Sequence, residues 1–332
     1  MKPATRSVLL SLAVGAACGV LYGLLTYAWM RSENVLAGVM VASYLFLVPL
    51  GLGLISSRFV PRGRGFGAYL GFAAATVGIF LVVALIVGWE GLICVSLAAP
   101  AMFVCGAIGA LIGYALRSWG GRTPALLLGA ALPAVLGPLE GRQAAPLEYR
   151  TAETSLVIHA DATRVWEQIR SVPLIAPAEL PQGWAYAIGL PRPREAVLAG
   201  EGVGAARTAT FQGGLSFLET VTDWAPGRRL AFRIEARDPG GLDPHVRVGG
   251  AFFDVLSGRY DIEPVAPDVV VLHLTSTQRL STHFNAYTGF FTQAIMRDLQ
   301  GSILQVIRTR AERTGLRFSA APATRGSGPV AR

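Results

Sequence analysis

The chain has 332 residues, 52% of them hydrophobic and only 15% charged, which is too apolar for two soluble domains. The formal net charge of +8 would suit a nucleic-acid partner, but the sequence contains no run of five or six like charges. The excess of basic residues lies before Gly141, with eight basic and three acidic residues there against 21 and 18 after it. A nucleic-acid arm is therefore excluded, and part of the chain is predicted to lie in a membrane. The three cysteines, Cys18, Cys94 and Cys105, all fall in apolar stretches, which excludes a disulfide scaffold.

Residues 1–140 are predicted to form a transmembrane bundle of four or five helices. Four charge-free stretches each exceed the roughly 20 residues that a helix needs to cross a bilayer. They are residues 7–30, 34–57, 65–89 and 91–116. A fifth stretch, 123–139, has only 17 residues and contains three prolines, so spanning, re-entrant and interfacial positions all stay open. We take it as spanning.

The basic residues of the loops predict the orientation of this bundle in a cell membrane. Lys2 and Arg6 precede the first span, and five arginines occupy the second and fourth loops, against Arg31 alone in the first loop. By the positive-inside rule the N-terminus is cytoplasmic. The polar half is then extracytoplasmic if 123–139 spans, and cytoplasmic if it does not.

The four spans contain no ionisable residue, which argues against a transport path and for an anchor. Glycines four residues apart predict close helix packing, within the chain or in a homo-oligomer. They are Gly15, Gly19 and Gly23, Gly67 and Gly71, and Gly109 and Gly113. The lipid bilayer is therefore the first predicted partner.

Beyond residue 140 the pattern changes to short alternating segments. We expect a linker at 141–150, a domain at 151–314 and a flexible tail at 315–332. The domain begins with a strand, the N-cap residue Asp161 and a short helix, and continues with strands that alternate with period two. It ends with an amphipathic helix from His283 to about Arg313. This order predicts an α+β domain in which a curved antiparallel sheet surrounds the long C-terminal helix.

Several segments of this half together resemble a known superfamily. They are Thr154 to Trp166, the Gly200–Gly204 turn followed by Arg207, Glu219 to Trp224 leading into Arg228 to Phe232, and the terminal helix. In this order they resemble the polyketide cyclase/START-related lipid-transport superfamily, SRPBCC, over about residues 150–313. The resemblance implies a helix-grip fold with a deep apolar cavity that binds lipids, sterols or polyketides, and catalysis in a minority of members.

The expected cavity lining combines apolar residues with a few polar ones. We predict that it comprises Phe217, Glu219, Phe232, Tyr260, His273, Phe291 and Ile295. We further predict that the terminal helix, and not the membrane bundle, closes the cavity, with Phe284, Tyr287 and Leu299 also facing the sheet. Glu219 could face the cavity or form a buried pair with Arg207 or Arg233, and His273 could face the cavity or be a hydrogen-bonded structural residue.

No catalytic residue, cofactor or metal is assigned. The four histidines lack the spacing of a helical metal site, and the polar half has no hydrolase elbow, phosphate loop or cysteine nucleophile. The favoured function is membrane-anchored binding or transfer of a hydrophobic, lipid-like ligand. A cyclase or hydrolase acting on a membrane-derived substrate, and a non-binding structural or regulatory membrane protein, stay open as alternatives.

Overall fold

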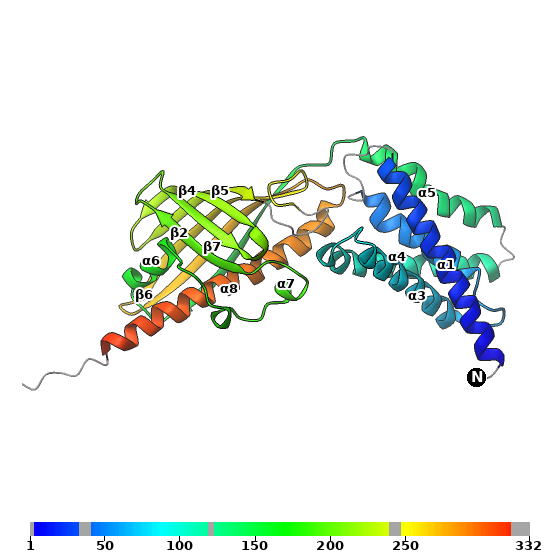
Figure 1. Ribbon diagram of the computed structural model, residues 1–332, viewed down its shortest axis with the longest axis horizontal. Helices are drawn as coiled ribbons and strands as arrows, with labels where there is room; N and C mark the ends of the chain where they lie inside the picture. Colours follow the sequence, from blue (N-terminus) through cyan, green and yellow to red (C-terminus); the bar gives the residue numbers. More distant parts are fainter. Residues whose placement is uncertain (1–2, 33–40, 119–122, 239–246, 320–332) are drawn as a thin grey trace, which may run out of the picture.

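The computed structural model describes residues 3–32, 41–118, 123–238 and 247–319, which form a helical bundle and a sheet-and-helix domain (Figure 1). The bundle comprises α1 (Pro3–Ser32), the π-helical turn η1 (Ser43–Leu47), α2 (Val48–Ser57), α3 (Phe66–Ile86), α4 (Leu92–Ser118) and α5 (Thr123–Gly141). The domain comprises β1 (Glu148–Ile158), α6 (Ala162–Arg170), η2 (Pro177–Glu179), α7 (Trp184–Ala187), β2 (Pro193–Ala199), β3 (Ala206–Phe211), η3 (Gln212–Gly214), β4 (Ser216–Ala225), β5 (Arg229–Asp238), β6 (Phe253–Ala266), β7 (Val269–Leu280) and α8 (Asn285–Ser319).

Three described helices are long and apolar enough to cross a membrane: α1, α3 and α4. Within the predicted second span, 34–57, η1 and α2 together run from Ser43 to Ser57. The remainder of that stretch, residues 34–40, lies outside the described residues. The fifth segment forms one helix of 19 residues that continues through Pro133 and Pro138. The prolines therefore do not divide α5.

Most of the paired glycines allow helices of the same chain to approach closely. A Cβ on Gly109 would overlap the carbonyl oxygen of Leu50, and one on Gly53 would overlap that of Gly106. Gly71 differs, since no atom lies within 4 Å of the position its Cβ would take. Backbone contact between α2 and α4 thus depends on the absence of side chains at their crossing.

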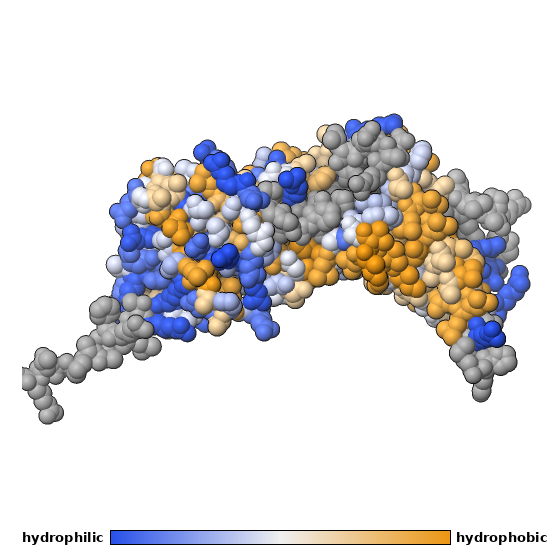
Figure 2. Space-filling view, viewed as in Figure 1, coloured by the Kyte–Doolittle hydropathy of each residue, from blue (hydrophilic) through white to orange (hydrophobic). Residues whose placement is uncertain are grey.

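The outer surface of the bundle is apolar. Figure 2 shows a continuous hydrophobic surface over the bundle and a mostly polar surface over the domain. Large exposed side chains on it include Leu21, Leu25, Val82, Ile86 and Val104. A surface of this extent would favour aggregation in water, and its apolarity suits the acyl region of a bilayer.

The domain is a seven-stranded antiparallel sheet in the order β1-β7-β6-β5-β4-β3-β2. Alternate residues along each strand face inward, as in β7, where Val270, Leu272 and Leu274 are buried. Helix α8 packs along this inner face and extends from the bundle to the far end of the domain (Figure 1). These are the elements of the helix-grip fold that the resemblance implies. The helix reaches Ser319, further than the predicted tail boundary at 315.

The far half of the domain is solid. Inward residues of the sheet pack there against Trp166 of α6 and against Leu304, Ile307 and Ala311 of α8. This core occupies the space between sheet and helix at the end of the domain far from the bundle.

Candidate functional site

The N-terminal end of α8 is joined to the helical bundle through aromatic contacts. Phe46 of η1 makes edge-to-face contacts with Phe284 and Tyr287, with ring centroids 6.3 and 6.0 Å apart. The Tyr287 hydroxyl donates to the Leu97 carbonyl at 2.6 Å and accepts from the Ala101 amide at 3.3 Å. An amide and a carbonyl four residues apart normally bond each other in an α-helix, so this hydroxyl contacts both groups of one step of the hydrogen-bond ladder of α4. The contact lies beside Pro100, which has no N–H and already weakens the ladder there.

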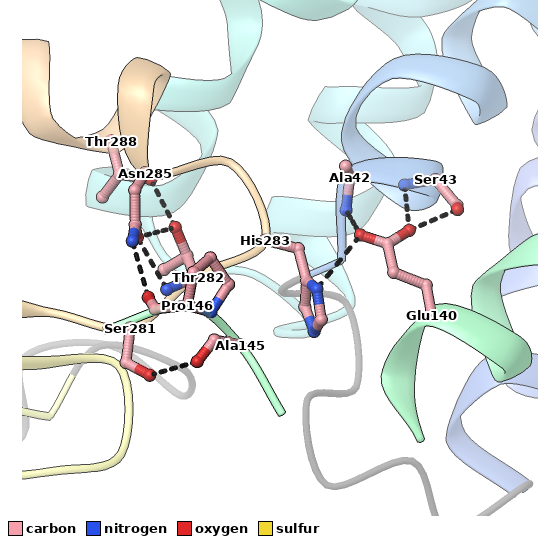
Figure 3. A network of polar contacts seen from close by, with 10 residues as sticks. All are labelled: Ala42, Ser43, Glu140, Ala145, Pro146, Ser281, Thr282, His283, Asn285 and Thr288. Carbon is pink, nitrogen blue, oxygen red and sulfur yellow. Dashed lines mark hydrogen bonds and ion pairs between the residues drawn. The ribbon is translucent and has the colours of Figure 1, made fainter. Parts of the chain in front are cut away.

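A polar network fastens the end of α5 beside this joint (Figure 3). The Glu140 carboxylate accepts hydrogen bonds from the Ala42 amide at 2.6 Å and the Ser43 amide at 2.9 Å. On its other side, Glu140 lies 3.8 Å from Nδ1 of His283, in the loop that leads into α8. The end of α5 is thereby tied both to the start of η1 and to the domain.

The linker is tied to the same loop. The Asn285 amide nitrogen donates to the Pro146 carbonyl at 2.7 Å, and its oxygen accepts from the Thr282 amide at 2.8 Å (Figure 3). Asn285 is buried, so these bonds are shielded from water. They fix the linker against the domain and hold the domain close to the bundle.

A cavity of about 250 Å³ lies at this joint, between bundle and domain. Its bundle wall includes Phe80, Leu81, Ala98 and Met102, and its domain wall includes Phe217, Val255, Phe291, Ile295 and Leu299. Phe80 lies six residues before the end of α3, and Met102 lies ten residues after the start of α4. At 1.5 Å per residue, Phe80 lies about 9 Å from the end of α3 and Met102 about 15 Å from the start of α4. The cavity therefore extends well into the bundle.

The prediction that α8 closes the main cavity without the bundle is therefore wrong. Phe291, Ile295 and Leu299 line the cavity on the domain side, but Phe284 and Tyr287 also pack on the bundle. The reason is that the apolar stripe of α8 is longer than the sheet can cover. Its first turn finds an apolar partner in η1 and α4 instead of in the sheet.

Of the seven predicted lining residues, Phe217, Phe291 and Ile295 border the cavity. Phe232 and Tyr260 lie deeper, in the solid core, with ring centroids 6.3 Å apart. Burial raises the pKa of the Tyr260 phenol, which is therefore uncharged at neutral pH. Neither of these two residues borders the cavity.

Glu219 forms a buried ion pair, one of the two arrangements that the sequence left open. Its carboxylate accepts from the Arg207 guanidinium at 2.7 Å, and the two side chains are only 12% and 4% exposed. The guanidinium also lies 4.8 Å from the ring centroid of Phe232, at cation–π distance. Glu219 does not border the cavity, and the geometry fits a structural pair.

His273 lies on the outer face of the sheet, opposite to its predicted orientation toward a cavity. Its ring nitrogens lie 2.7 Å from the Ser155 hydroxyl and 3.2 Å from Glu263. Glu263 is 67% exposed, so this cluster is in contact with solvent. In the described part of the chain, no group of three or more His, Cys, Asp or Glu residues could hold a metal ion.

The bundle wall of the cavity was missed by reasoning from the sequence. Phe80, Leu81, Ala98 and Met102 are typical residues of a membrane helix, and no local pattern separates those that face lipid from those that face a cavity. Only the docking of α8 onto α3 and α4 gives them this position.

No protein-family model and no curated protein matches this chain. Solved structures do match. The Zhui aromatase/cyclase from Streptomyces sp. R1128 is 17% identical, with a TM-score of 0.36 over 53% of this chain and 100% of that one. Norcoclaurine synthase from Thalictrum flavum is 15% identical, with a TM-score of 0.33 over 53% and 91%. A conserved protein from Geobacillus kaustophilus is 15% identical, with a TM-score of 0.34 over 50% and 97%.

Proposed function

We propose that this protein binds a hydrophobic, lipid-like ligand in the cavity between its membrane bundle and its helix-grip domain. The observation that carries the proposal is that both parts of the chain contribute to the cavity wall. The bundle contributes Phe80, Leu81 and Met102, and the domain contributes Phe217 and Ile295. An apolar cavity favours an apolar ligand, because it offers little to replace the hydration of a charged one. A cavity that begins within the membrane helices also gives such a ligand a short path from the bilayer.

The size of the cavity supports a small ligand or one end of a longer one. Its volume of about 250 Å³ is slightly below the range of about 300–1,000 Å³ for small-molecule sites. A whole membrane phospholipid would not fit. A single acyl or isoprenoid-like chain segment would.

The positions of the loops support an extracytoplasmic domain. The domain contacts the bundle where η1 begins and α3 ends, and Glu140 brings the end of α5 to that same side. The basic loop that contains Arg58 and Arg62 joins the opposite ends of α2 and α3. With that loop in the cytoplasm, α5 crosses the bilayer and the domain lies outside.

Binding can be tested with a pair of variants that add the same volume in two places. Ala98 lines the cavity on α4, whereas Ala74 is exposed on the outer surface of α3. For the full chain in lipid nanodiscs, we expect Ala98→Phe to weaken binding of a fluorescent fatty-acid analogue several-fold and Ala74→Phe to leave it unchanged. Equal binding by both variants, or no binding by the wild type, would refute the proposed function.

The orientation has its own test. Val265 is 63% exposed at the far end of the domain, and Arg62 lies in the second loop. In intact cells, a membrane-impermeant maleimide should label Val265→Cys and should label Arg62→Cys only after permeabilisation. The reverse pattern would place the domain in the cytoplasm.

A further inference from the structure

Among the described residues that line the cavity, two are charged. Glu90 lies on the bundle side, in the turn between α3 and α4, and Arg247 lies on the domain side, in the loop between β5 and β6. Arg247 is exposed to solvent although it lines the cavity, so it marks the mouth, where the cavity meets water. The apolar lining extends from this level into the bundle.

The two charged residues differ in their partners. Glu90 takes part in an interaction within the protein. The Arg247 guanidinium forms no ion pair and no hydrogen bond with the residues that the structure describes. Next to this loop, Asp254 and Arg279 are direct cross-strand partners on β6 and β7, so together they contribute one charge of each sign. Arg247 is therefore the charge at the mouth that a ligand can neutralise.

The backbone around Arg247 is held in place by packing and hydrogen bonds. Val248 is 8% exposed and packs in one cluster with Phe217, which lines the cavity. The Arg247 carbonyl accepts from the Gly250 amide at 3.1 Å, and the Arg279 guanidinium donates to the Gly250 carbonyl. Because the main chain is fixed, a ligand that binds the guanidinium has to order only one side chain.

The threonine hydroxyls that line the cavity already donate to the protein itself. Thr282 bonds the amide oxygen of Asn285 at 2.9 Å, and Thr288 and Thr292 each bond a backbone carbonyl of the preceding turn at 3.3 Å. Arg247 differs from them, since its guanidinium has five N–H donors and a full positive charge. The groups that can recognise a polar end of the ligand are thus concentrated at the mouth.

We propose that the ligand is a single-chain amphiphile with an anionic head group, a carboxylate or a phosphate, which Arg247 binds at the mouth while the chain extends toward Phe80 and Met102. This inference rests on the proposed function and adds the charge and the orientation of the ligand. A guanidinium binds either anion through paired hydrogen bonds. The head group stays in contact with water, so the apolar interior does not have to solvate its charge. Glu90 repels an anion from the bundle side, which favours the position at Arg247.

The test uses decanoate, decyl phosphate, 1-decanol and decyltrimethylammonium as competitors of pyrene, an uncharged fluorescent probe, on the full chain in nanodiscs. Each competitor enters the lipid equally with wild type and variant, so the ratio of the two affinities isolates the protein site. Arg247→Gln should weaken decanoate and decyl phosphate about three- to tenfold, between the effect of an exposed ion pair and that of a charged hydrogen bond. It should leave decanol unchanged and should not weaken decyltrimethylammonium. The anion that loses more affinity identifies the head group.

Arg233→Gln is the matched control, since Arg233 has a side chain that is 66% exposed and follows the inward-facing Phe232, so it lies on the outer face of the sheet. It should leave all four affinities unchanged. A second measurement needs no variant: raising the salt concentration should weaken decanoate but not decanol in the wild type, because ions screen the contact with Arg247.

The inference is overturned if Arg247→Gln leaves the two anions unchanged or weakens decanol equally, or if salt has no effect on decanoate. In each of these cases decanol still displaces pyrene, so the proposed function stands. If pyrene does not bind, or if no competitor displaces it, the proposed function itself fails and this inference fails with it.

Discussion

Replacing Gly109 by alanine should destabilise the bundle, because the added methyl group has no space at the crossing of α2 and α4. Its Cβ would overlap the Leu50 carbonyl oxygen and would lie 2.9 Å from the carbonyl carbon and 3.1 Å from the Leu50 Cα. All three are backbone atoms, so no side chain can rotate away and the two helices must separate. Overpacking of this kind typically costs about 1–3 kcal/mol, and the loss of contact between the helices places the expected value in the upper half of that range.

Gly71→Ala is the matched control, since it adds the same methyl group on α3 where no atom lies within 4 Å. It should be neutral or stabilising by up to about 1 kcal/mol, the difference in helix propensity between alanine and glycine. Both variants can be compared by thermal unfolding in the same detergent, followed by intrinsic fluorescence. If Gly109→Ala unfolds at the temperature of Gly71→Ala or above it, α2 and α4 do not approach each other as described.

Three further changes test the domain and its joint. Hydrogen bonding by Arg310 lowers the pKa of Glu179 from 4.5 to about 2, so the ionised pair stabilises the fold above about pH 4.5 and this stability is lost as the pH falls toward 2. This lowering of the pKa corresponds to at most about 3 kcal/mol, which partial exposure reduces to about 1–2 kcal/mol. Arg310→Met should flatten the dependence of melting temperature on pH over this interval, and an unchanged slope would exclude the pair. Tyr287→Phe should destabilise the joint by about 0.5–1.5 kcal/mol in detergent unfolding, since it removes the hydroxyl that bonds two α4 backbone groups, and a wild-type melting temperature would contradict this contact. Glu219→Ala should lower the free energy of unfolding by about 3–5 kcal/mol in chemical denaturation, because it leaves Arg207 buried without its partner. The double variant Glu219→Leu with Arg207→Met should recover most of this stability. An equal loss of stability in the single and the double variant would argue against a buried pair.

The broad architecture could be predicted because it depends on strong, local patterns. Uninterrupted apolar stretches identify α1, α3 and α4, and the alternation of strands followed by a long amphipathic stripe identifies the domain. The second apolar stretch differs, because a span is predicted over 34–57 and only its part from Ser43 to Ser57 lies in described helical elements. Apolar composition does not specify where a helix begins.

The cavity was less predictable than the fold, because its position depends on how two domains meet. Alternation assigns residues to one of two faces of a strand, but it does not say which face is inside, and His273 was placed on the wrong one. A side chain that faces the interior of the domain does not necessarily border the cavity. Glu219 and Tyr260 point into the domain, yet they lie beyond the end of the cavity, where Trp166 and Leu304 fill the space.

The contact of Tyr287 with α4 makes the order of synthesis matter for this chain. Leu97 and Tyr287 are separated by 190 residues, so the ribosome completes the bundle and the whole sheet before it supplies the phenol that contacts α4. Until then the Ala101 amide and the Leu97 carbonyl beside Pro100 lack this additional partner. A nascent chain, or one truncated before α8, therefore lacks a contact that lies far upstream of its end, and the bundle reaches its final packing only when the C-terminal helix arrives.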